Sequence, residues 1–196
     1  MVTLAITGGI ACGKSLTAQF LSARGIPVCD TDQVGHALLK RGEPVGEAVA
    51  REFGPSILGS DGEINRSELG KQVFAAPGRL ARLNELTHPA IMQHTRDWMA
   101  AQGGSTGIAA AVIPLLYEIG DESQWTSVLC VAAPEEDQLK RLAERGLTPD
   151  EARARIASQL GLAVKMERAD YVVYNCGSKT LLEEQVEHVV RSLRGE

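Results

Sequence analysis

Apolar runs and amphipathic stretches alternate along this chain, and each kind of pattern predicts a different element. Continuous apolar segments predict strands at residues 2–7, 26–29, 108–113, 126–132 and 169–174. Apolar residues at helical spacing lie between and after them, as in the stripe Leu182, Val186, Val189 and Leu193. Strands that alternate with helices predict a parallel sheet covered on both faces. We therefore expect an α/β fold of three layers, α/β/α, with about five parallel strands.

One long region departs from this alternation, because residues 44–103 carry helical patterns and few strand signals. Within it we expect a turn at Thr87-His88-Pro89, with Pro89 as the first residue of a helix that runs to about Gln102. Gly103-Gly104-Ser105 then predicts a break before the third strand. We interpret the region as a helical insertion, which is a natural place to bind an acceptor substrate.

The most informative motif follows the first predicted strand. Residues 8–15 read Gly-Gly-Ile-Ala-Cys-Gly-Lys-Ser, which fits the phosphate-loop pattern of Gly, four residues, Gly, Lys and Ser or Thr. A helical pattern begins near Lys14, so the motif lies between a strand and a helix, as it requires. Glycines let backbone N–H groups approach an anion, and the helix start adds unpaired donors. Lys14 suits the β- and γ-phosphates of a nucleotide, and the Ser15 hydroxyl suits Mg²⁺.

Two carboxylates stand at the end of the second predicted strand. Asp30 and Asp32 flank Thr31, and ligands of open α/β sheets gather at the carboxyl ends of the strands. Asp32 could take a proton from a hydroxyl that attacks the γ-phosphate, or help to hold the metal. An aspartate at this place also suits a helix N-cap. The local pattern leaves capping and catalysis open, and each residue could serve one of them.

Arginines gather around a predicted hinge between two helices. Arg141 and Arg145 precede Gly146, and Arg153 and Arg155 follow the capping-box pattern at residues 148–151. We interpret the pair of helices as a lid over ATP phosphates, because a transferred phosphoryl group needs cationic neutralisation. The alternative is a solvated face of paired charges.

Other strand ends add candidates for binding. Leu115 and Leu116 follow the third strand and are candidate walls of the acceptor site, with core packing as the alternative. Asn175 follows the last strand and could contact an adenine edge, although asparagine also suits turns. In the insertion, Arg66, Lys71 and His88 are candidate acceptor contacts that could equally be ordinary surface residues.

Length and composition place these motifs in one globular domain of 196 residues. We divide it into a nucleotide-binding core at 1–43, 104–135 and 165–196, an acceptor-binding insertion at 44–103 and a lid at 136–164. The net charge of −5 argues against a broad nucleic-acid surface. There is no apolar run of membrane-spanning length, and the spacing of the four cysteines predicts reduced thiols without structural zinc. We expect a cytoplasmic monomer without nucleic-acid or membrane partners.

Several separate stretches together resemble the dephospho-CoA kinase family over nearly the full length. Besides the phosphate loop they include Asp30-Thr31-Asp32, His88-Pro89 and Pro114-Leu115-Leu116-Tyr117-Glu118. Smaller matches are residues 38–42, Asp61-Gly62 with Arg66, Phe74, Gln138-Leu139-Lys140-Arg141, Gln159 and Asn175. A phosphate loop alone is common to many families, but this combination at this spacing is highly specific.

The resemblance implies ATP-dependent phosphorylation of the ribose 3′-hydroxyl of dephospho-CoA, which gives coenzyme A and ADP. It implies that Asp32 is the general base, that Lys14 and Arg141 act on the phosphates, and that Ser15 holds Mg²⁺. The implied ATP contacts are Gly9, Ile10, Ala11, Cys12, Gly13, Lys14, Ser15, Leu16, Arg141 and Asn175. The implied acceptor contacts are Asp32, Arg66, His88 and Leu115.

Two residues of the loop depart from the family pattern, in which glycine commonly stands at the position of Ala11 and serine or alanine at that of Cys12. A thiol beside a helix start is expected to have a lowered pKa, so we predict that alkylation of Cys12 blocks ATP binding; the alternative is an inert small side chain. The nearest alternative function is that of another small P-loop nucleoside or nucleotide kinase. A GTP-binding switch is less compatible, because the Asn-Lys-x-Asp guanine-reading motif is absent.

Overall fold

A computed structural model describes residues 1–102 and 107–196; the side chains of residues 74, 75 and 77 are outside the description as well. The chain forms two compact units, one of Met1–Cys29 with Gln102–Glu196 and one of Asp30–Ala101. We call them the sheet unit and the helical unit. The break predicted at Gly103-Gly104-Ser105 lies outside the described residues, as does the side chain of Phe74.

The five strands form a sheet in the order β2-β3-β1-β4-β5. Their bounds are β1 Val2–Gly8, β2 Val28–Asp30, β3 Ile108–Val112, β4 Ser127–Ala132 and β5 Tyr171–Tyr174. β1 pairs in parallel with β3 on one side and with β4 on the other, and β4 pairs in parallel with β5. β2 and β3 lie on one side of β1, and β4 and β5 lie on the other side. The loop after β1 therefore lies at a topological switch point, where open sheets bind ligands.

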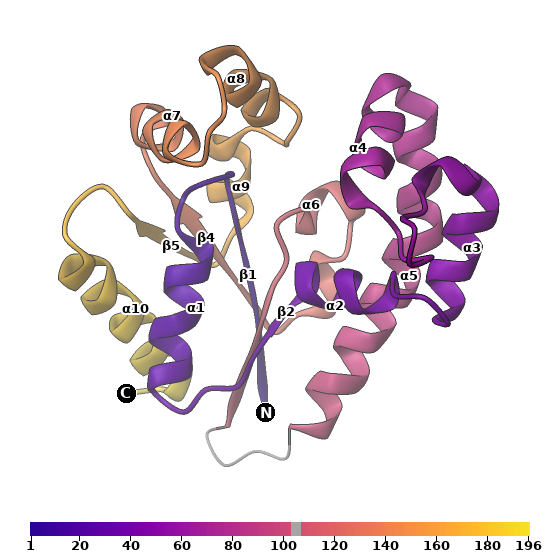
Figure 1. The fold of residues 1–196 in the computed structure, drawn as a ribbon. Coiled ribbons are helices and arrows are strands. Elements are labelled where there is room, and N and C mark those ends of the chain that lie inside the picture. Colours follow the sequence, from indigo (N-terminus) through magenta and orange to yellow (C-terminus); the bar gives the residue numbers. More distant parts are fainter. Residues whose placement is uncertain (103–106) are drawn as a thin grey trace. The chain divides into compact units, whose positions relative to one another are not determined.

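Helices cover both faces of this sheet, which confirms the three-layer α/β/α prediction (Figure 1). α1 (Lys14–Ala23) and α10 (Lys179–Arg194) pack side by side on one face, and α9 (Leu162–Arg168) packs on β1 and β4. Apolar residues of the strands, such as Leu4, Ile6 and Leu129, are completely buried in this core. The shorter elements of the unit are α6 (Leu116–Ile119) and the 3-10 turn Glu122–Gln124.

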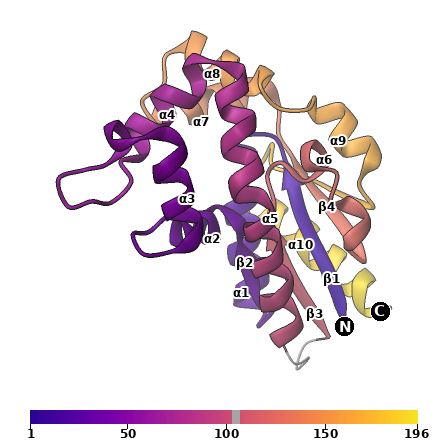
Figure 2. The same cartoon turned by 90° about the vertical axis from the view of Figure 1, so that its right-hand side faces the viewer.

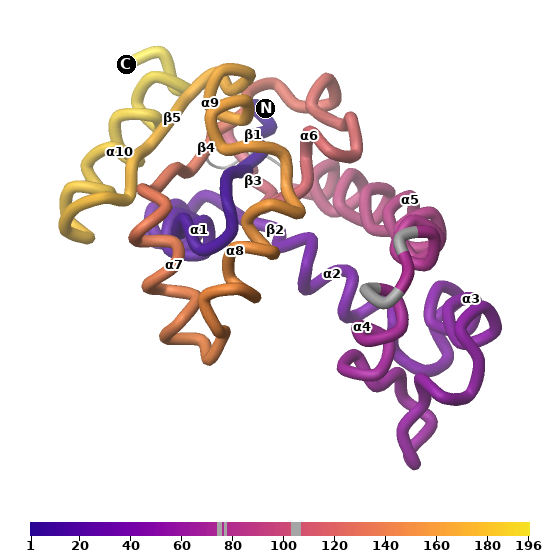
Figure 3. The backbone as a smooth tube through the Cα atoms, turned by 90° about the horizontal axis from the view of Figure 1, so that it is seen from above, coloured from indigo at the N-terminus to yellow at the C-terminus, as the bar shows by residue number. Residues whose placement is uncertain are grey.

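Two further helices of the sheet unit correspond to the predicted lid. α7 (Glu135–Glu144) and α8 (Pro149–Ala157) lie next to each other (Figure 3). The predicted capping box begins α8, because the Thr148 hydroxyl accepts from the Glu151 N–H while the Glu151 carboxylate accepts from the Thr148 N–H. The capping pattern in the sequence therefore located this helix start correctly.

The helical unit contains α2 (Thr31–Leu38), α3 (Pro44–Phe53), the 3-10 turn Pro55–Ile57, α4 (Arg66–Ala75) and the long helix α5 (Pro77–Ala101), as Figure 2 shows. Its own apolar core is centred on Val49, Ile57 and Val73. No helix in the described part of the chain, in either unit, is long and apolar enough to cross a membrane.

The predicted turn at Thr87-His88-Pro89 is wrong, since α5 continues through Pro89. A proline inside a helix removes one hydrogen bond and costs roughly 3 kcal/mol. Packing offsets this cost, because α5 contacts α2, α3 and α4 along its length. Thr87 makes one further hydrogen bond within α5, donating from its hydroxyl to the carbonyl oxygen of Leu83 at 2.9 Å.

Candidate active site

The phosphate loop joins the end of β1 to the start of α1. Three of its residues have a positive φ: Gly8 at 136°, Ala11 at 58° and Gly13 at 107°. A β-carbon at Gly8 would lie 2.1 Å from the carbonyl oxygen of Val131, and one at Gly13 would lie 2.3 Å from Nδ2 of Asn175. Both positions therefore require glycine, for conformation and for space.

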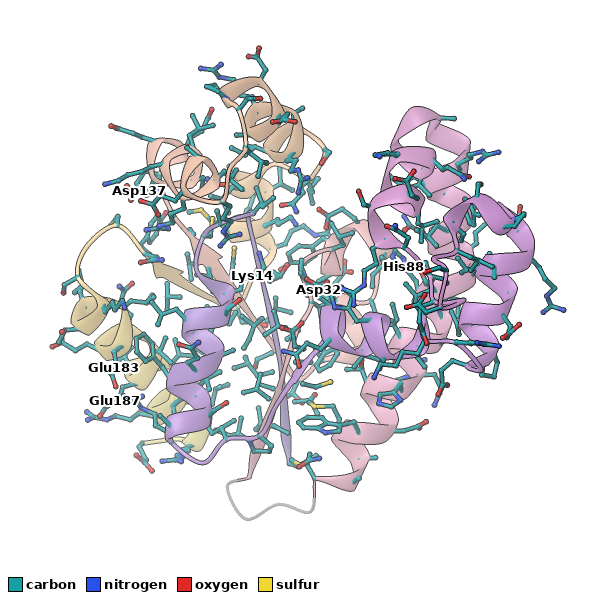
Figure 4. The ribbon with its side chains drawn as sticks, in the orientation of Figure 1. Lys14, Asp32, His88, Asp137, Glu183 and Glu187 are labelled. Carbon is teal, nitrogen blue, oxygen red and sulfur yellow. The ribbon has the colours of Figure 1, made fainter. Side chains whose placement is uncertain are left out.

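Lys14 is the first residue of α1, where Figure 4 labels it. Its ammonium group donates to the carbonyl oxygens of Gly8, at 3.1 Å, and Gly9, at 2.8 Å. The cation is thus held against the backbone of the loop that is expected to bind phosphate. Ser15 follows with an exposed side chain, and a hydroxyl oxygen is a suitable ligand for a hard cation such as Mg²⁺.

Two polar side chains from later in the chain hold the carbonyl groups of the loop. Arg141 of α7 donates from Nη1 to the carbonyl oxygen of Ala11 and from Nη2 to that of Asn175, each at 3.0 Å. Asn175 is buried and donates from Nδ2 to the carbonyl oxygen of Cys12 at 2.9 Å. Arg141, Asn175 and the loop, which are far apart in the sequence, therefore lie together.

Ala11 has a left-handed backbone conformation, which costs an L-residue roughly 1–2 kcal/mol. The positive φ explains why a family pattern would favour glycine at this position. Here the methyl group is buried in a small apolar cluster with Leu142 of α7 and Ala152 of α8. Alanine therefore adds a contact between the loop and the helices α7 and α8, and this contact offsets part of the strain.

A cavity of about 480 Å³ lies beside the loop, and its walls include Gly9, Ile10, Gln138 and Gln159. The Ile10 N–H donates to Oε1 of Gln159 at 3.0 Å, which ties the segment between α8 and α9 to the loop. Gln138 is buried and donates to the carbonyl oxygen of Ala133 at 3.1 Å. The cavity thus combines loop backbone with fixed polar side chains from the lid side.

Similarity to known proteins identifies the family. Residues 2–180 match the family model of dephospho-CoA kinase. The chain belongs to the dephospho-CoA kinase family. A dephospho-CoA kinase of Anaeromyxobacter dehalogenans is 42% identical over 199 residues, which cover 100% of this chain and 93% of that protein.

Solved structures agree with this membership. A crystal structure from Thermus thermophilus is similar with a TM-score of 0.84 at 32% identity, covering 98% of this chain and 97% of that one. The dephospho-CoA kinase of Campylobacter jejuni is similar with a TM-score of 0.74 at 26% identity, covering 98% of both chains. The prediction of an ATP-dependent kinase of the dephospho-CoA kinase family is confirmed.

In this dephospho-CoA kinase family member, the two aspartates at the end of β2 have different local positions. Asp30 is the N-cap of α2, and its Oδ1 accepts from the Asp32 N–H at 2.9 Å. Asp32 lies in the first turn of α2 with an exposed side chain, labelled in Figure 4. The capping role open in the sequence therefore belongs to Asp30, and capping does not require the carboxylate of Asp32.

The candidate acceptor contacts of the insertion lie on two helices. Arg66 is the first residue of α4 and is exposed, and Lys71 of the same helix pairs with Glu68 at 2.7 Å. His88 lies within α5, where burial lowers its pKa from the ordinary value of 6.5. A cavity of about 500 Å³ in the helical unit is lined by Arg41, among others, and by neither Arg66 nor His88.

Leu115 belongs to the sheet unit, directly before α6, and its side chain is half-buried. The neighbouring Leu116 is completely buried in the core. The two leucines are therefore not equivalent: core packing explains Leu116, whereas Leu115 keeps an accessible surface.

The predicted lowering of the Cys12 pKa is wrong. The thiol is 0% exposed, and burial raises its pKa even though Lys14 and Arg141 act in the opposite direction. Helix starts and nearby cations favour a thiolate only where the thiol is accessible. An alkylating reagent therefore has no access to the sulfur, and burial also disfavours the reactive thiolate. The predicted block of ATP binding by alkylation is no longer expected.

Sequence reasoning gave no role to two buried polar residues near the loop, Gln138 and Lys165. Gln138 was recognised only through the resemblance, in the stretch that ends at Arg141. Lys165 lies on α9, a helix of seven residues that the apolar pattern did not predict. The pattern of apolar and polar residues around Lys165 does not distinguish a buried lysine from a surface lysine, so the sequence does not predict its burial.

Proposed function

We propose that this protein transfers the terminal phosphoryl group of ATP to the ribose 3′-hydroxyl of dephospho-CoA, giving coenzyme A and ADP. The observation that carries the proposal is the conformation of the phosphate loop. Positive φ angles at Gly8, Ala11 and Gly13, next to the start of α1, turn backbone N–H groups into a concave anion site. Family membership supplies the substrate class.

The groups proposed to act on the phosphates come from the sheet unit. Lys14 exchanges its bonds to the carbonyls of Gly8 and Gly9 for the β- and γ-phosphate oxygens of ATP. Arg141 adds positive charge for the transferring group and Asn175 contacts adenine. Ser15 would hold Mg²⁺, which neutralises phosphate charge when bound. The complete proposed ATP contact set is Gly9, Ile10, Ala11, Cys12, Gly13, Lys14, Ser15, Leu16, Arg141 and Asn175.

The proposed general base is Asp32. Its carboxylate takes the proton from the ribose 3′-hydroxyl as that oxygen forms a bond to the γ-phosphorus. The bond from the γ-phosphorus to the bridging oxygen breaks at the same time, and the electron pair leaves with ADP. Two features support the assignment: Asp32 lies two residues beyond the end of β2, and Asp30 already supplies the helix cap.

The remaining roles complete the proposal. Residues 44–103 bind the acceptor, with Arg66 and His88 as contacts, and Leu115 contributes from the end of β3. Residues 136–164 act as a lid that excludes water, which would otherwise hydrolyse ATP. Residues 1–43, 104–135 and 165–196 form the nucleotide-binding core. We further propose a cytoplasmic monomer that has no nucleic-acid or membrane partner.

The test is an acceptor panel with purified protein, ATP and Mg²⁺. Dephospho-CoA, adenosine, AMP and CMP are offered separately, and ADP release is followed together with the phosphorylated product. We expect dephospho-CoA to give the highest kcat/KM by a wide margin and its product to carry the phosphate at the 3′ position. A preference for AMP, CMP or adenosine would replace this function with that of another P-loop kinase.

A further inference from the structure

Lys165 is a completely buried lysine to which the proposed mechanism assigns no role. Its side chain is 0% exposed, and its ammonium lies 2.7 Å from Oε1 of Glu118 and 2.9 Å from the carbonyl oxygen of Pro114. Lysine is rarely buried unless it is paired, because leaving water disfavours the charge. The two short contacts supply the compensation, so the position of this ammonium is narrowly defined.

Both partners of Lys165 belong to the segment that leaves the sheet after β3. Pro114 is the second residue after the end of β3, Leu115 follows it, and Glu118 lies on α6. The carbonyl oxygen of Pro114 also accepts from the hydroxyl of Thr7, at 3.4 Å, and Thr7 directly precedes the phosphate loop. Lys165 therefore fixes the backbone beside Leu115 from one side, while β1 fixes it from the other.

Glu118 extends the connection to the lid side. The same oxygen that pairs with Lys165 accepts from the Leu160 N–H at 2.9 Å. The neighbouring Gln159 accepts from the Ile10 N–H of the phosphate loop at 3.0 Å. A continuous path of polar contacts thus runs from Lys165 through Glu118 and the α8–α9 segment to the loop.

We infer that Lys165 is a positioning residue for phosphoryl transfer. It acts through Glu118 and Pro114. Through these two contacts it fixes the segment that carries Leu115, and the α8–α9 segment, relative to the phosphate loop. The inference rests on the proposed function, because it concerns the rate of the same transfer. Phosphoryl transfer depends mainly on positioning, and small displacements of binding groups lower its rate strongly.

The first variant is Lys165→Met, which keeps the length of the side chain and removes its donors. We expect kcat with dephospho-CoA to fall about 10²-fold, while the Kd for ATP with Mg²⁺ changes little, because a displacement near 1 Å costs about that factor. The matched control is Arg168→Met on the same helix. Arg168 stacks on the ring of Tyr117, 4.4 Å from its centroid, and pairs with Glu122, but it lies outside the path described above. Its kcat should stay near that of the wild type.

The double variant Lys165→Met with Glu118→Gln separates positioning from stability. It removes both charges, and the glutamine oxygen can still accept from the Leu160 N–H. We expect Tm to recover towards the wild type while kcat stays low, because the Pro114 carbonyl still lacks its bond from Lys165 and keeps only the longer one from Thr7. This variant also carries the test if Lys165→Met alone does not fold.

Two results would overturn the inference: a wild-type kcat in Lys165→Met, or recovery of kcat together with Tm in the double variant. Either result would mean that Lys165 contributes to stability and does not position groups for phosphoryl transfer. The wild-type reaction is measured in the same series. If the wild type makes no coenzyme A, the proposed function fails; if it is active and the variants match it, the positioning role alone fails.

Discussion

The phosphate loop and the helical unit present their candidate ligand-binding groups in different ways. In the loop, the groups proposed to face an anion are backbone N–H groups, and the half-buried Arg141 and the buried Asn175 hold the backbone in place. In the helical unit, the candidates Arg66 and His88 are side chains on two different helices. A site made of backbone N–H groups depends on the local backbone conformation of the loop. A site made of side chains depends on how tertiary packing places the helices that carry them. The loop should therefore tolerate substitution far less than the insertion does.

The largest effect on turnover is expected at Asp32, the proposed general base. Asp32→Asn should lower turnover about 10²- to 10⁴-fold and leave ATP binding intact, because it removes a general base and no phosphate ligand. Asp30→Asn is the matched control, since asparagine caps helices as well as aspartate does. Steady-state kinetics and nucleotide titration measure the two quantities. Near-normal turnover in Asp32→Asn would remove this residue as the base.

Arg141→Ala should come next, with a loss of about 10²- to 10³-fold in kcat, as for one preorganised donor at a developing charge. The loss of ATP affinity should be smaller, because Lys14 and the backbone N–H groups of the loop remain as proposed phosphate contacts. Arg145→Ala tests the neighbouring exposed arginine and should change kcat little. Equal losses of kcat in the two variants would show that the general positive charge of this surface matters, and would contradict a specific role for Arg141.

A pair of glycine substitutions compares the two regions directly. Gly13→Ala should destabilise the protein by roughly 1–3 kcal/mol and weaken ATP binding, because φ is 107° and the new β-carbon would meet Nδ2 of Asn175. Gly70→Ala lies in α4, where a β-carbon meets no atom within 4 Å, and should stabilise by about 0.5–1 kcal/mol. Urea unfolding measures both. Similar values at the two sites would contradict the contrast between loop and insertion.

The smallest expected effect concerns His88 and pH. Burial lowers the pKa of His88 in the folded state below 6.5, so the unfolded state binds its proton more readily. Stability contributed by the neutral imidazole is therefore present above about pH 6.5 and declines as the pH falls from there towards the folded pKa. His88→Gln should flatten this decline in urea unfolding measured between pH 7.5 and 5. An unchanged slope would place the titration elsewhere in the protein.

Much of the sheet unit could be predicted because its signals are local. A buried apolar run, a glycine-rich loop and a helical stripe together define β1, the phosphate loop and α1 without any long-range contact. The capping box at Thr148 predicted the start of α8 in the same way. Each of these features is encoded within about ten residues.

The failures occurred where tertiary packing decided the outcome. Pro89 is a helix-breaking signal, yet α5 runs through it because the helix packs against α2, α3 and α4. The choice between Asp30 and Asp32 as the helix cap was left open by the sequence, and the hydrogen bond from the Asp32 N–H to Asp30 decides it. Lys165 is completely buried although its residue type predicts a surface position. Cys12 lies beside two cations, but burial outweighs them.

The burial of Cys12 has a consequence for an enzyme whose substrate and product end in a thiol. Such molecules form mixed disulfides with proteins, and this exchange requires a protein thiolate that the incoming sulfur can reach. Cys12 offers neither access nor ready ionisation, whereas Cys176, just beyond Asn175, is exposed. Oxidised forms of the coenzyme should therefore attach at Cys176 first, and the nucleotide site can carry a cysteine without being blocked by its own product.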